Sequence, residues 1–541
     1  MGCGGDPDDW LWRLAASRRH LALIAAVVAA VYLAGVTGKW RPTPDSAAYL
    51  GLGRAIANGE GYRFNGEVNT QFPPGLPVIL AGVRLVAGED FWVANLFVTL
   101  CGLGALLVAY RCLRRIGAEP PLALLAALAT AASFNFYLIS HHILSDMPYT
   151  LIFWALLYAA ISYLGGRSWA LAAAIVLTVA GVLVRVPSLL LTVPLAVGIV
   201  LDGSAAVGGS GGPAARRKWT AACAIAASAC LTTVVLYVLA RRIGQAEPRY
   251  VTLVSGSVGA DPLRLLGRLY EAALAWPLTF TKLVVSQDGF WFAGLPIMAL
   301  ALVGLVVLWR EKRRAVPTLV VLYLLSLAAS LGSWGMAARY LVPIAPLLFY
   351  VSLLGLHRAV GFIAARLRRP PAGSPALAVL MGVLLICNMP RLAREAFYYS
   401  YLSYTPRYYE AIQSGKFADF MTVADLLRRR SPPQACVATE DSPSVLCYLT
   451  GRLTIPLPST GRRGTTDVRT VLDFLDSHTE TDFVVLDGAP EGKRFVKGLQ
   501  EALSSDPAYA LLFRGRYLLY QRVGPPAERR ISSTTATAQG P

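Results

Sequence analysis

Charged residues are scarce in this chain of 541 residues. Asp, Glu, Lys and Arg together make up 15% of it, against roughly 25% in an average soluble domain. Hydrophobic residues make up 55%, and uncharged runs of about 17–25 residues, the length of a membrane-spanning helix, recur over the first 390 positions. The low charge therefore excludes an ordinary soluble protein and predicts an α-helical polytopic membrane protein with a soluble tail.

The sequence motifs of several soluble enzymes are also missing. The tail contains no phosphate loop, no paired zinc cysteines and no nucleophile elbow, and the chain shows no internal repeat of fixed period. The first apolar run, residues 21–37, follows Arg18 and Arg19, but no small-residue cleavage site comes after it. We therefore predict a retained first helix rather than a signal peptide.

Net charge is +18, and the basic residues stand in short clusters between apolar runs. That pattern orients membrane proteins and disfavours nucleic-acid binding. We predict about eleven transmembrane helices, near residues 21–38, 91–110, 120–139, 147–164, 168–184, 186–201, 219–240, 289–309, 316–336, 340–356 and 374–390. Basic clusters then fall in alternate loops, which predicts a cytoplasmic N-terminus and an extracytoplasmic tail in a plasma-membrane protein.

Two of the expected external loops are long, residues 38–90 and 241–288. Within the first, residues 45–57 follow a proline and begin with Asp45 in the place of an N-cap. Residues 74–87 form an apolar stretch too short to span a bilayer. We predict that both are helices lying along the membrane interface.

The tail alternates helix-like segments with short apolar runs typical of strands, such as DFVVLD and YLLYQRV. We divide the chain into a transmembrane domain (1–390), an extracytoplasmic α/β domain (391–525) and a disordered end (526–541). Cys436 and Cys447 lie in the tail, where an oxidising compartment favours a disulfide. Two buried thiols are the alternative.

Asp45 lies just after the first span, and Tyr49 lies four residues later on the same helix face. The carboxylate at the membrane surface could accept a proton from a substrate hydroxyl. The alternative is that Asp45 only caps its helix, and both roles are compatible.

A second polar group, HHILSDMPY, joins the third and fourth spans. It places His141, His142 and Asp146 near one another, which suggests either interfacial anchoring or a divalent metal site. Adjacent helical residues point about 100° apart, so the two histidines rarely share one ion. Metal binding is therefore the less favoured alternative, and no cofactor is certain.

Arg185 and Arg339 each stand at the outer edge of a span and are followed by a proline. Charge in a membrane is costly, so such residues pair with a partner, line a pathway or extend to the headgroups. The forked donors of a guanidinium also suit a lipid phosphate.

Five segments stand out by their order and by their place in the predicted topology: PDSAAYLGLGRAIANGEGY, QFPPGLPVILAGVRLVAG, SDMPY, LVRVP and RYLVPIAPLL. Together they resemble the membrane glycosyltransferases of the C-type fold. The resemblance is strongest to the bacterial branch that includes lipid A aminoarabinose transferases and relatives of the protein O-mannosyltransferases.

The resemblance implies sugar transfer from a polyprenyl-phosphate-linked donor on the outer leaflet to a lipid, glycan or protein acceptor. It implies that Asp45 is the catalytic base and that Asp146 matches the acidic residue of the second external loop. We assign Tyr49, His142, Asp146, Arg185 and Arg339 to substrate binding. Ser46 stands where the protein-mannosylating branch has Glu, which puts a protein acceptor in doubt.

A transporter or lipid-linked sugar flippase is the main alternative function. Transporters usually bind substrate near the bilayer midplane, often on broken helices. Here the notable polar residues lie at the outer ends of helices, and the first loop is long for a simple carrier. Both features favour the transferase.

Overall fold

The computed structural model describes residues 10–185, 188–202, 212–244, 262–284, 294–331, 338–367, 373–405, 407–412, 416–458, 468–488 and 494–524. The chain divides into two compact units. The first comprises Met1–Arg41, Leu52–Tyr62 and Val68–Tyr404, and the second comprises Pro42–Gly51, Arg63–Glu67 and Thr405–Pro541. The expected disordered end, residues 526–541, lies outside the described residues.

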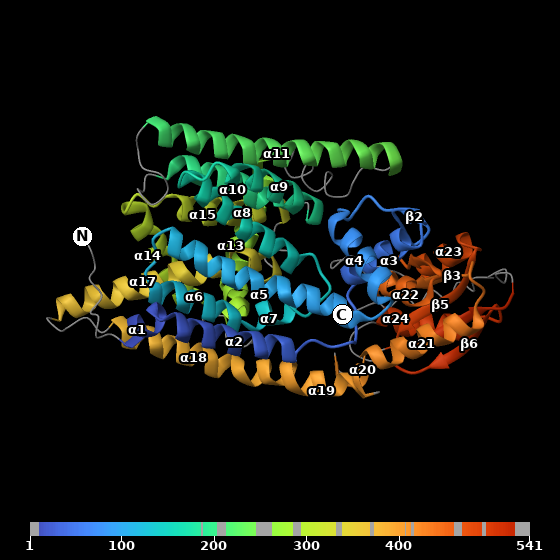
Figure 1. Ribbon diagram of the computed structural model, residues 1–541. Helices are drawn as coiled ribbons and strands as arrows, with labels where there is room; N and C mark the ends of the chain where they lie inside the picture. The colour runs from blue at the N-terminus through green and yellow to red at the C-terminus, as the bar shows by residue number, and fades with distance from the viewer. Residues whose placement is uncertain are drawn as a thin grey trace. The chain divides into compact units, whose positions relative to one another are not determined.

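The first unit is helical. Its helices are α1 (Trp10–Ala16), α2 (Arg18–Ala34), α4 (Gly75–Ala87), α5 (Phe91–Arg115), α6 (Pro120–Ala132), α7 (Phe134–Ile139), α8 (Asp146–Leu164), α9 (Trp169–Val184), α10 (Leu189–Leu201), α11 (Gly212–Gly244), α13 (Pro262–Val284), α14 (Gly294–Arg310), α15 (Ala315–Leu331), α16 (Ala338–Leu341), α17 (Ala345–Arg366) and α18 (Gly373–Ala393). Several of the long helices, α2, α5, α11 and α18 among them, lie roughly along one direction (Figure 1). A π-helix (Arg394–Tyr399) and α19 (Ser400–Ser403) continue from α18. Helix α3 (Pro44–Ala57) begins in the second unit and ends in the first.

Four helical segments of the described chain are long and apolar enough to cross a membrane: Phe91–Arg115, Asp146–Leu164, Ala214–Arg242 and Ala338–Arg366. The pair α1 and α2, bent by 80°, would make a fifth. The other expected spans correspond to shorter helices; residues 120–139, for example, break at Ser133, whose side chain caps α7. Membrane crossing by these shorter helices, and hence the number eleven, stays a prediction.

The helices expected at 45–57 and 74–87 of the first long loop are confirmed as α3 and α4. The second long loop, expected at 241–288, includes a helix that was not predicted from the sequence, the 23-residue α13 at Pro262–Val284. Its place outside the membrane stays a prediction. Its charged residues are spaced so that an apolar face remains, and the guanidinium of Arg268 donates to the carbonyl oxygen of Ala329 at 3.1 Å.

Glycines allow helices α14 and α17 to approach closely. A Cβ atom at Gly304 would overlap the carbonyl of Val351, and one at Gly355 would overlap the carbonyl of Leu300. Membrane helices commonly use small residues in this way, because van der Waals contact between backbones then replaces the hydrophobic driving force.

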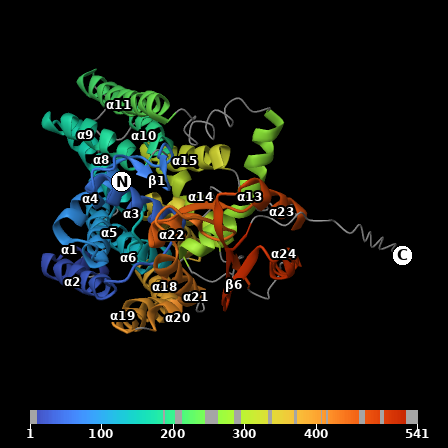
Figure 2. The same cartoon turned by 90° about the vertical axis from the view of Figure 1, so that its right-hand side faces the viewer.

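The second unit contains a five-stranded mixed sheet in the order β4-β3-β5-β7-β6, with several of its helices labelled in Figure 2. Strands β3 (Cys436–Thr439), β4 (Leu453–Pro456) and β5 (Thr481–Asp487) are parallel, and β6 (Tyr509–Arg514) and β7 (Tyr517–Arg522) are antiparallel. The helices are α20 (Tyr408–Ala411), α21 (Lys416–Arg430), α22 (Pro443–Thr450), α23 (Val468–Ser477) and α24 (Arg494–Ser505). An α/β tail was expected, and the described residues form one.

The expected disulfide between Cys436 and Cys447 is wrong. Both residues are buried thiols. Cys436 opens β3, where its backbone N–H donates to the Asp482 carboxylate at 2.9 Å, whereas Cys447 lies inside α22. Each thiol is therefore held in its own element of the domain core, where a small apolar side chain packs well.

Candidate functional site

The start of α8 and the end of α9 bring two of the expected site residues together. Asp146 is the first residue of α8, and Arg185 directly follows α9. Oδ1 of Asp146 lies 2.6 Å from Nη1 of Arg185, and the two side chains are only 3% and 10% exposed. Because α8 and α9 are packed against each other as consecutive helices, residues separated by 39 positions become an ion pair.

Tyr340 joins Arg339 to this pair. The Arg185 guanidinium carbon lies 5.3 Å from the centre of the Tyr340 ring, and that of Arg339 lies 5.1 Å from it. Nη2 of Arg339 also donates to the Tyr340 hydroxyl at 3.3 Å. Two cations therefore share one aromatic ring, an arrangement that the ring's negative faces stabilise.

Two further tyrosines surround the arginines. The hydroxyl of Tyr323, on α15, donates to the carbonyl oxygen of Tyr340 at 2.6 Å. Tyr149 lies one turn after Asp146 on α8, is 3% exposed, and interacts electrostatically with Arg185 and Tyr323. Its buried hydroxyl has no hydrogen-bond partner in the described part of the chain. An unsatisfied buried donor is costly, which makes Tyr149 a candidate for contact with a ligand.

We call Asp146, Tyr149, Arg185, Tyr323, Arg339 and Tyr340 the arginine cluster. Its two guanidiniums and one carboxylate give it a net positive charge, so it can hold an anion. Its carboxylate is already the counterion of Arg185, whose guanidinium it holds in place.

The two histidines before α8 do not add positive charge to the arginine cluster. Both ring nitrogens of His141 lie 2.8 Å from backbone carbonyl oxygens, those of Tyr137 and Tyr32. Burial lowers the pKa of His141 to about 4 and the pKa of His142 to about 3, so both rings are neutral at pH 7. His142 can therefore act as a hydrogen-bonding group, not as a cation.

Metal binding at this junction finds little support in the geometry. Both ring nitrogens of His141 face carbonyl oxygens at 2.8 Å, which leaves no room for an ion beside either nitrogen, and Asp146 is paired with Arg185. Within the described ranges, no three His, Cys, Asp or Glu side chains are grouped so that they could hold a metal ion.

Asp45 lies in the second unit, at the second residue of α3, and is half-buried. Its role as a helix cap stays a prediction. Thr43 and Ser46 form a reciprocal capping box, in which the N–H of Ser46 donates to Thr43 Oγ1 at 3.1 Å and the N–H of Thr43 donates to Ser46 Oγ at 3.0 Å. The Asp45 carboxylate is therefore not needed to cap this helix. Tyr49 is buried on the same helix.

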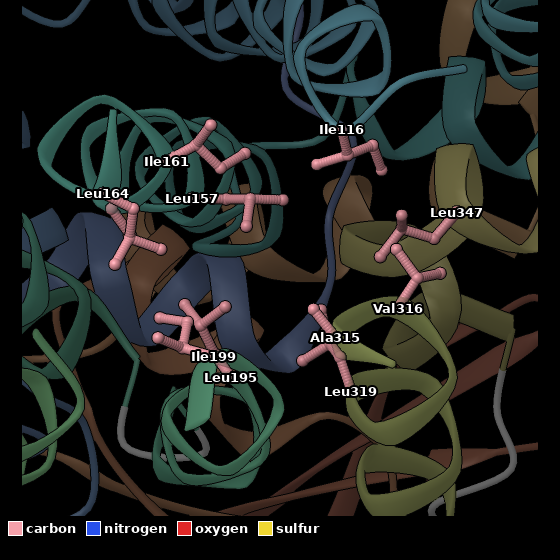
Figure 3. Close-up of a pocket in the computed structure, with 11 residues that line it drawn as sticks. Ile116, Leu157, Ile161, Leu164, Leu195, Ile199, Ala315, Val316, Leu319 and Leu347 are labelled. Atoms are coloured by element: carbon pink, nitrogen blue, oxygen red, sulfur yellow. The ribbon is translucent and has the colours of Figure 1, made fainter. Parts of the chain in front are cut away.

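A separate cavity lies among α8, α10, α15 and α17 (Figure 3). The side chains that line it are all apolar, and they include Leu157, Leu195 and Leu319. With no polar group in its wall, this cavity cannot bind the charged part of a substrate.

Residues 71–207 match the family of dolichyl-phosphate-mannose-protein mannosyltransferases, and this segment contains Asp146 and Arg185. No curated protein sequence matches the chain.

Solved structures match nearly the whole chain. ArnT from Cupriavidus metallidurans bound to undecaprenyl phosphate has a TM-score of 0.55 at 14% identity, covering 93% of this chain and 98% of ArnT. The oligosaccharyltransferase AglB from Archaeoglobus fulgidus, in complex with an inhibitory peptide and a dolichol-phosphate, has a TM-score of 0.54 at 12% identity, covering 91% and 73%. The TM-scores show that the chain shares the fold of these proteins, and at identities this low the likeness shows the fold alone.

Proposed function

We propose, from the C-type membrane glycosyltransferase fold that this chain shares with ArnT and AglB, that it is a polyprenyl-phosphate-dependent glycosyltransferase. It moves a sugar from the lipid-linked donor to an acceptor at the outer face of the membrane. The match of residues 71–207 to a family that uses dolichyl-phosphate-mannose supports a donor of this class. Hexose and pentose donors both fit the proposal.

The observation that carries the proposal is the pair of guanidiniums on the Tyr340 ring, next to the unsatisfied hydroxyl of Tyr149. A polyprenyl phosphate needs positive charge and hydrogen-bond donors as it leaves, because its phosphate is already a weak base. Guanidiniums supply both. Arg185, Arg339 and Tyr149 are the groups to which we assign this role.

The attacking hydroxyl of the acceptor needs a group that takes its proton, and we assign this role to Asp45. The acceptor hydroxyl attacks the anomeric carbon, the bond from that carbon to the phosphate oxygen breaks, and the hydroxyl proton passes to the carboxylate. Direct displacement inverts the anomeric centre. The products are a glycosylated acceptor and a polyprenyl phosphate. The phosphate gains one negative charge when the bond breaks, and the proton taken up by Asp45 balances it.

We place the reaction on the extracytoplasmic side of the plasma membrane. Residues 1–390 then form the transmembrane transferase domain, with a cytoplasmic N-terminus, and residues 391–525 form an extracytoplasmic domain. The alternation of basic clusters along the loops supports this orientation.

The experiment is a comparison of membrane lipids and envelope glycans from three strains: with the gene, without it, and with the Asp45→Asn form in its place. We expect one sugar modification to be present in the first strain and lost in the other two. Equal amounts of Asp45→Asn and wild-type protein, by immunoblot of membranes, are the control. Identical lipids and glycans in all three strains would refute the proposed activity.

A further inference from the structure

A tight hairpin in the first long loop carries an unusual asparagine. Strands β1 (Arg63–Phe64) and β2 (Glu67–Val68) pair and are joined by Asn65 and Gly66, with φ angles of 56° and 79°. Positive φ at both positions is the geometry of a two-residue hairpin turn, for which Asn-Gly is the favoured sequence. The turn places the Asn65 carboxamide at the tip of the hairpin.

That carboxamide binds the backbone of an edge strand in the α/β domain. Asn65 Nδ2 donates to the carbonyl oxygen of Thr454 at 2.6 Å, and the N–H of Thr454 donates to Asn65 Oδ1 at 2.7 Å. Thr454 lies in β4, which forms one edge of the five-stranded sheet, and it is 1% exposed. The Asn65 side chain therefore bonds to β4 as a neighbouring strand would. It satisfies the backbone N–H and carbonyl of Thr454, which an edge strand otherwise leaves without a partner.

The same hairpin packs against the middle of α3, at Gly51. The Phe64 ring lies so close to Gly51 that a Cβ at that position would overlap it. Gly66 faces Leu453 in β4. These contacts explain why residues Pro42–Gly51, with Asp45 among them, form one compact unit with the domain that follows Thr405.

We propose that Asn65 is a positioning residue for Asp45, through which the C-terminal α/β domain holds the first turns of α3. The role of Asp45 as base rests on the function proposed above, whereas the mechanical coupling does not. Asn65 fixes the hairpin to β4, Phe64 transmits that restraint to Gly51, and the helix that begins at Pro44 keeps its carboxylate in place. This gives the tail domain a part in transfer without any catalytic residue of its own.

Asn65→Gly is the variant that tests the coupling. Glycine adopts the positive φ of the turn without strain, so the hairpin keeps its shape while both bonds to the β4 backbone are lost. Thr454→Val is the matched control: it removes a hydroxyl from the same contact but leaves the backbone N–H and carbonyl of Thr454 bonded to Asn65.

Two measurements on the full-length protein in detergent separate the possible results. In hydrogen exchange, Asn65→Gly should speed exchange at Thr454 and also in residues 44–51, whereas Thr454→Val should leave 44–51 as in wild type. In sugar transfer, Asn65→Gly should lower kcat by about 10- to 100-fold, the effect of a slightly misplaced catalytic group, with the donor KM unchanged.

Faster exchange confined to β4, or a kcat within twofold of wild type while transfer is measurable, would overturn the proposal. If exchange in 44–51 responds as expected but wild-type protein transfers no sugar, the coupling stands and the proposed activity is the part that fails.

Discussion

Asp146 and Arg185 form a buried ion pair with 2.6 Å between Oδ1 and Nη1, which connects the first turn of α8 to the residue after α9. The Asp146 carboxylate partly neutralises the Arg185 guanidinium and holds it against the Tyr340 ring. Of the two acidic residues singled out in the sequence, Asp146 is therefore suited to orient a cation. Asp45 is the one left for proton transfer.

Removing the charge of Asp146 should destabilise the protein. Asp146→Asn leaves the buried Arg185 without its counterion, which typically costs about 3–5 kcal/mol of unfolding free energy. The double variant Asp146→Asn/Arg185→Gln should recover part of that loss, because no uncompensated charge remains. Thermal unfolding in detergent measures both. Equal stability of Asp146→Asn and wild type would mean that the pair contributes nothing.

Replacing Arg339 should weaken use of the donor. Arg339→Lys keeps the charge but loses the forked donors, and Arg339→Ala loses both. We expect kcat/KM for the lipid-linked donor to fall about tenfold in the first and further in the second, since hydrogen bonds to charged groups contribute about 1.5–3 kcal/mol. Arg366→Lys is the matched control, because Arg366 lies 5.3 Å from the Phe362 ring in a similar cation–aromatic contact. Full activity in both Arg339 variants would remove it from the site.

Tyr149→Phe should separate stability from activity. Its hydroxyl is buried without a partner, and such a group costs about 1–3 kcal/mol, so its removal should raise the unfolding free energy. If the hydroxyl donates to the donor phosphate, the donor KM should rise at the same time. A less stable variant with unchanged KM would show that the hydroxyl is already satisfied in the free protein.

Asp45→Asn should abolish most transfer without harming the fold. Loss of a general base typically costs about 10²–10⁴ in rate. Stability should hold because Thr43 and Ser46 cap α3. Asp90→Asn is the control, since Asp90 is an acidic residue of the same loop that does cap its helix, accepting from the N–H of Trp92 at 2.8 Å. Activity near the wild-type level in Asp45→Asn would exclude it as the base.

Reporter fusions test the proposed orientation. A fusion after Lys218 should report the cytoplasm, and a fusion after Arg522 should report the extracytoplasmic side. The basis is the basic cluster at the start of α11 and the expected odd number of spans. Both reporters on one side of the membrane would contradict the eleven-span topology.

The helical part of the fold could be predicted from sequence because long apolar runs are an unambiguous signal. Residues 91–110 and 147–164 correspond to α5 and α8 within a few positions. The helix at Pro262–Val284 was not predicted, because its charges were considered without their spacing, which leaves one apolar face. Charge content alone does not reveal periodicity.

The candidate site was predicted residue by residue but not as an arrangement. Arg185 and Asp146 were each singled out, yet their pairing depends on how α8 and α9 pack, which no local pattern encodes. Tyr149 and Tyr340 stand inside the quoted segments SDMPY and RYLVPIAPLL, so a signal for them was present. Asn65 gave only a turn signal, because its partner lies 389 positions away.

The contact between Gly304 and Gly355 sets a limit on how this protein can vary. A spacing between helices fixed by main-chain atoms cannot adjust through a change of rotamer, as one filled by leucines can. The short segment that carries Tyr340 leads through one turn of 3₁₀-helix, Val342–Ile344, into α17, so a shift of α17 against α14 would also move the segment that carries this ring. Exposed positions of α14, such as Leu302, are therefore open to exchange, whereas these two glycines must be kept in any redesign.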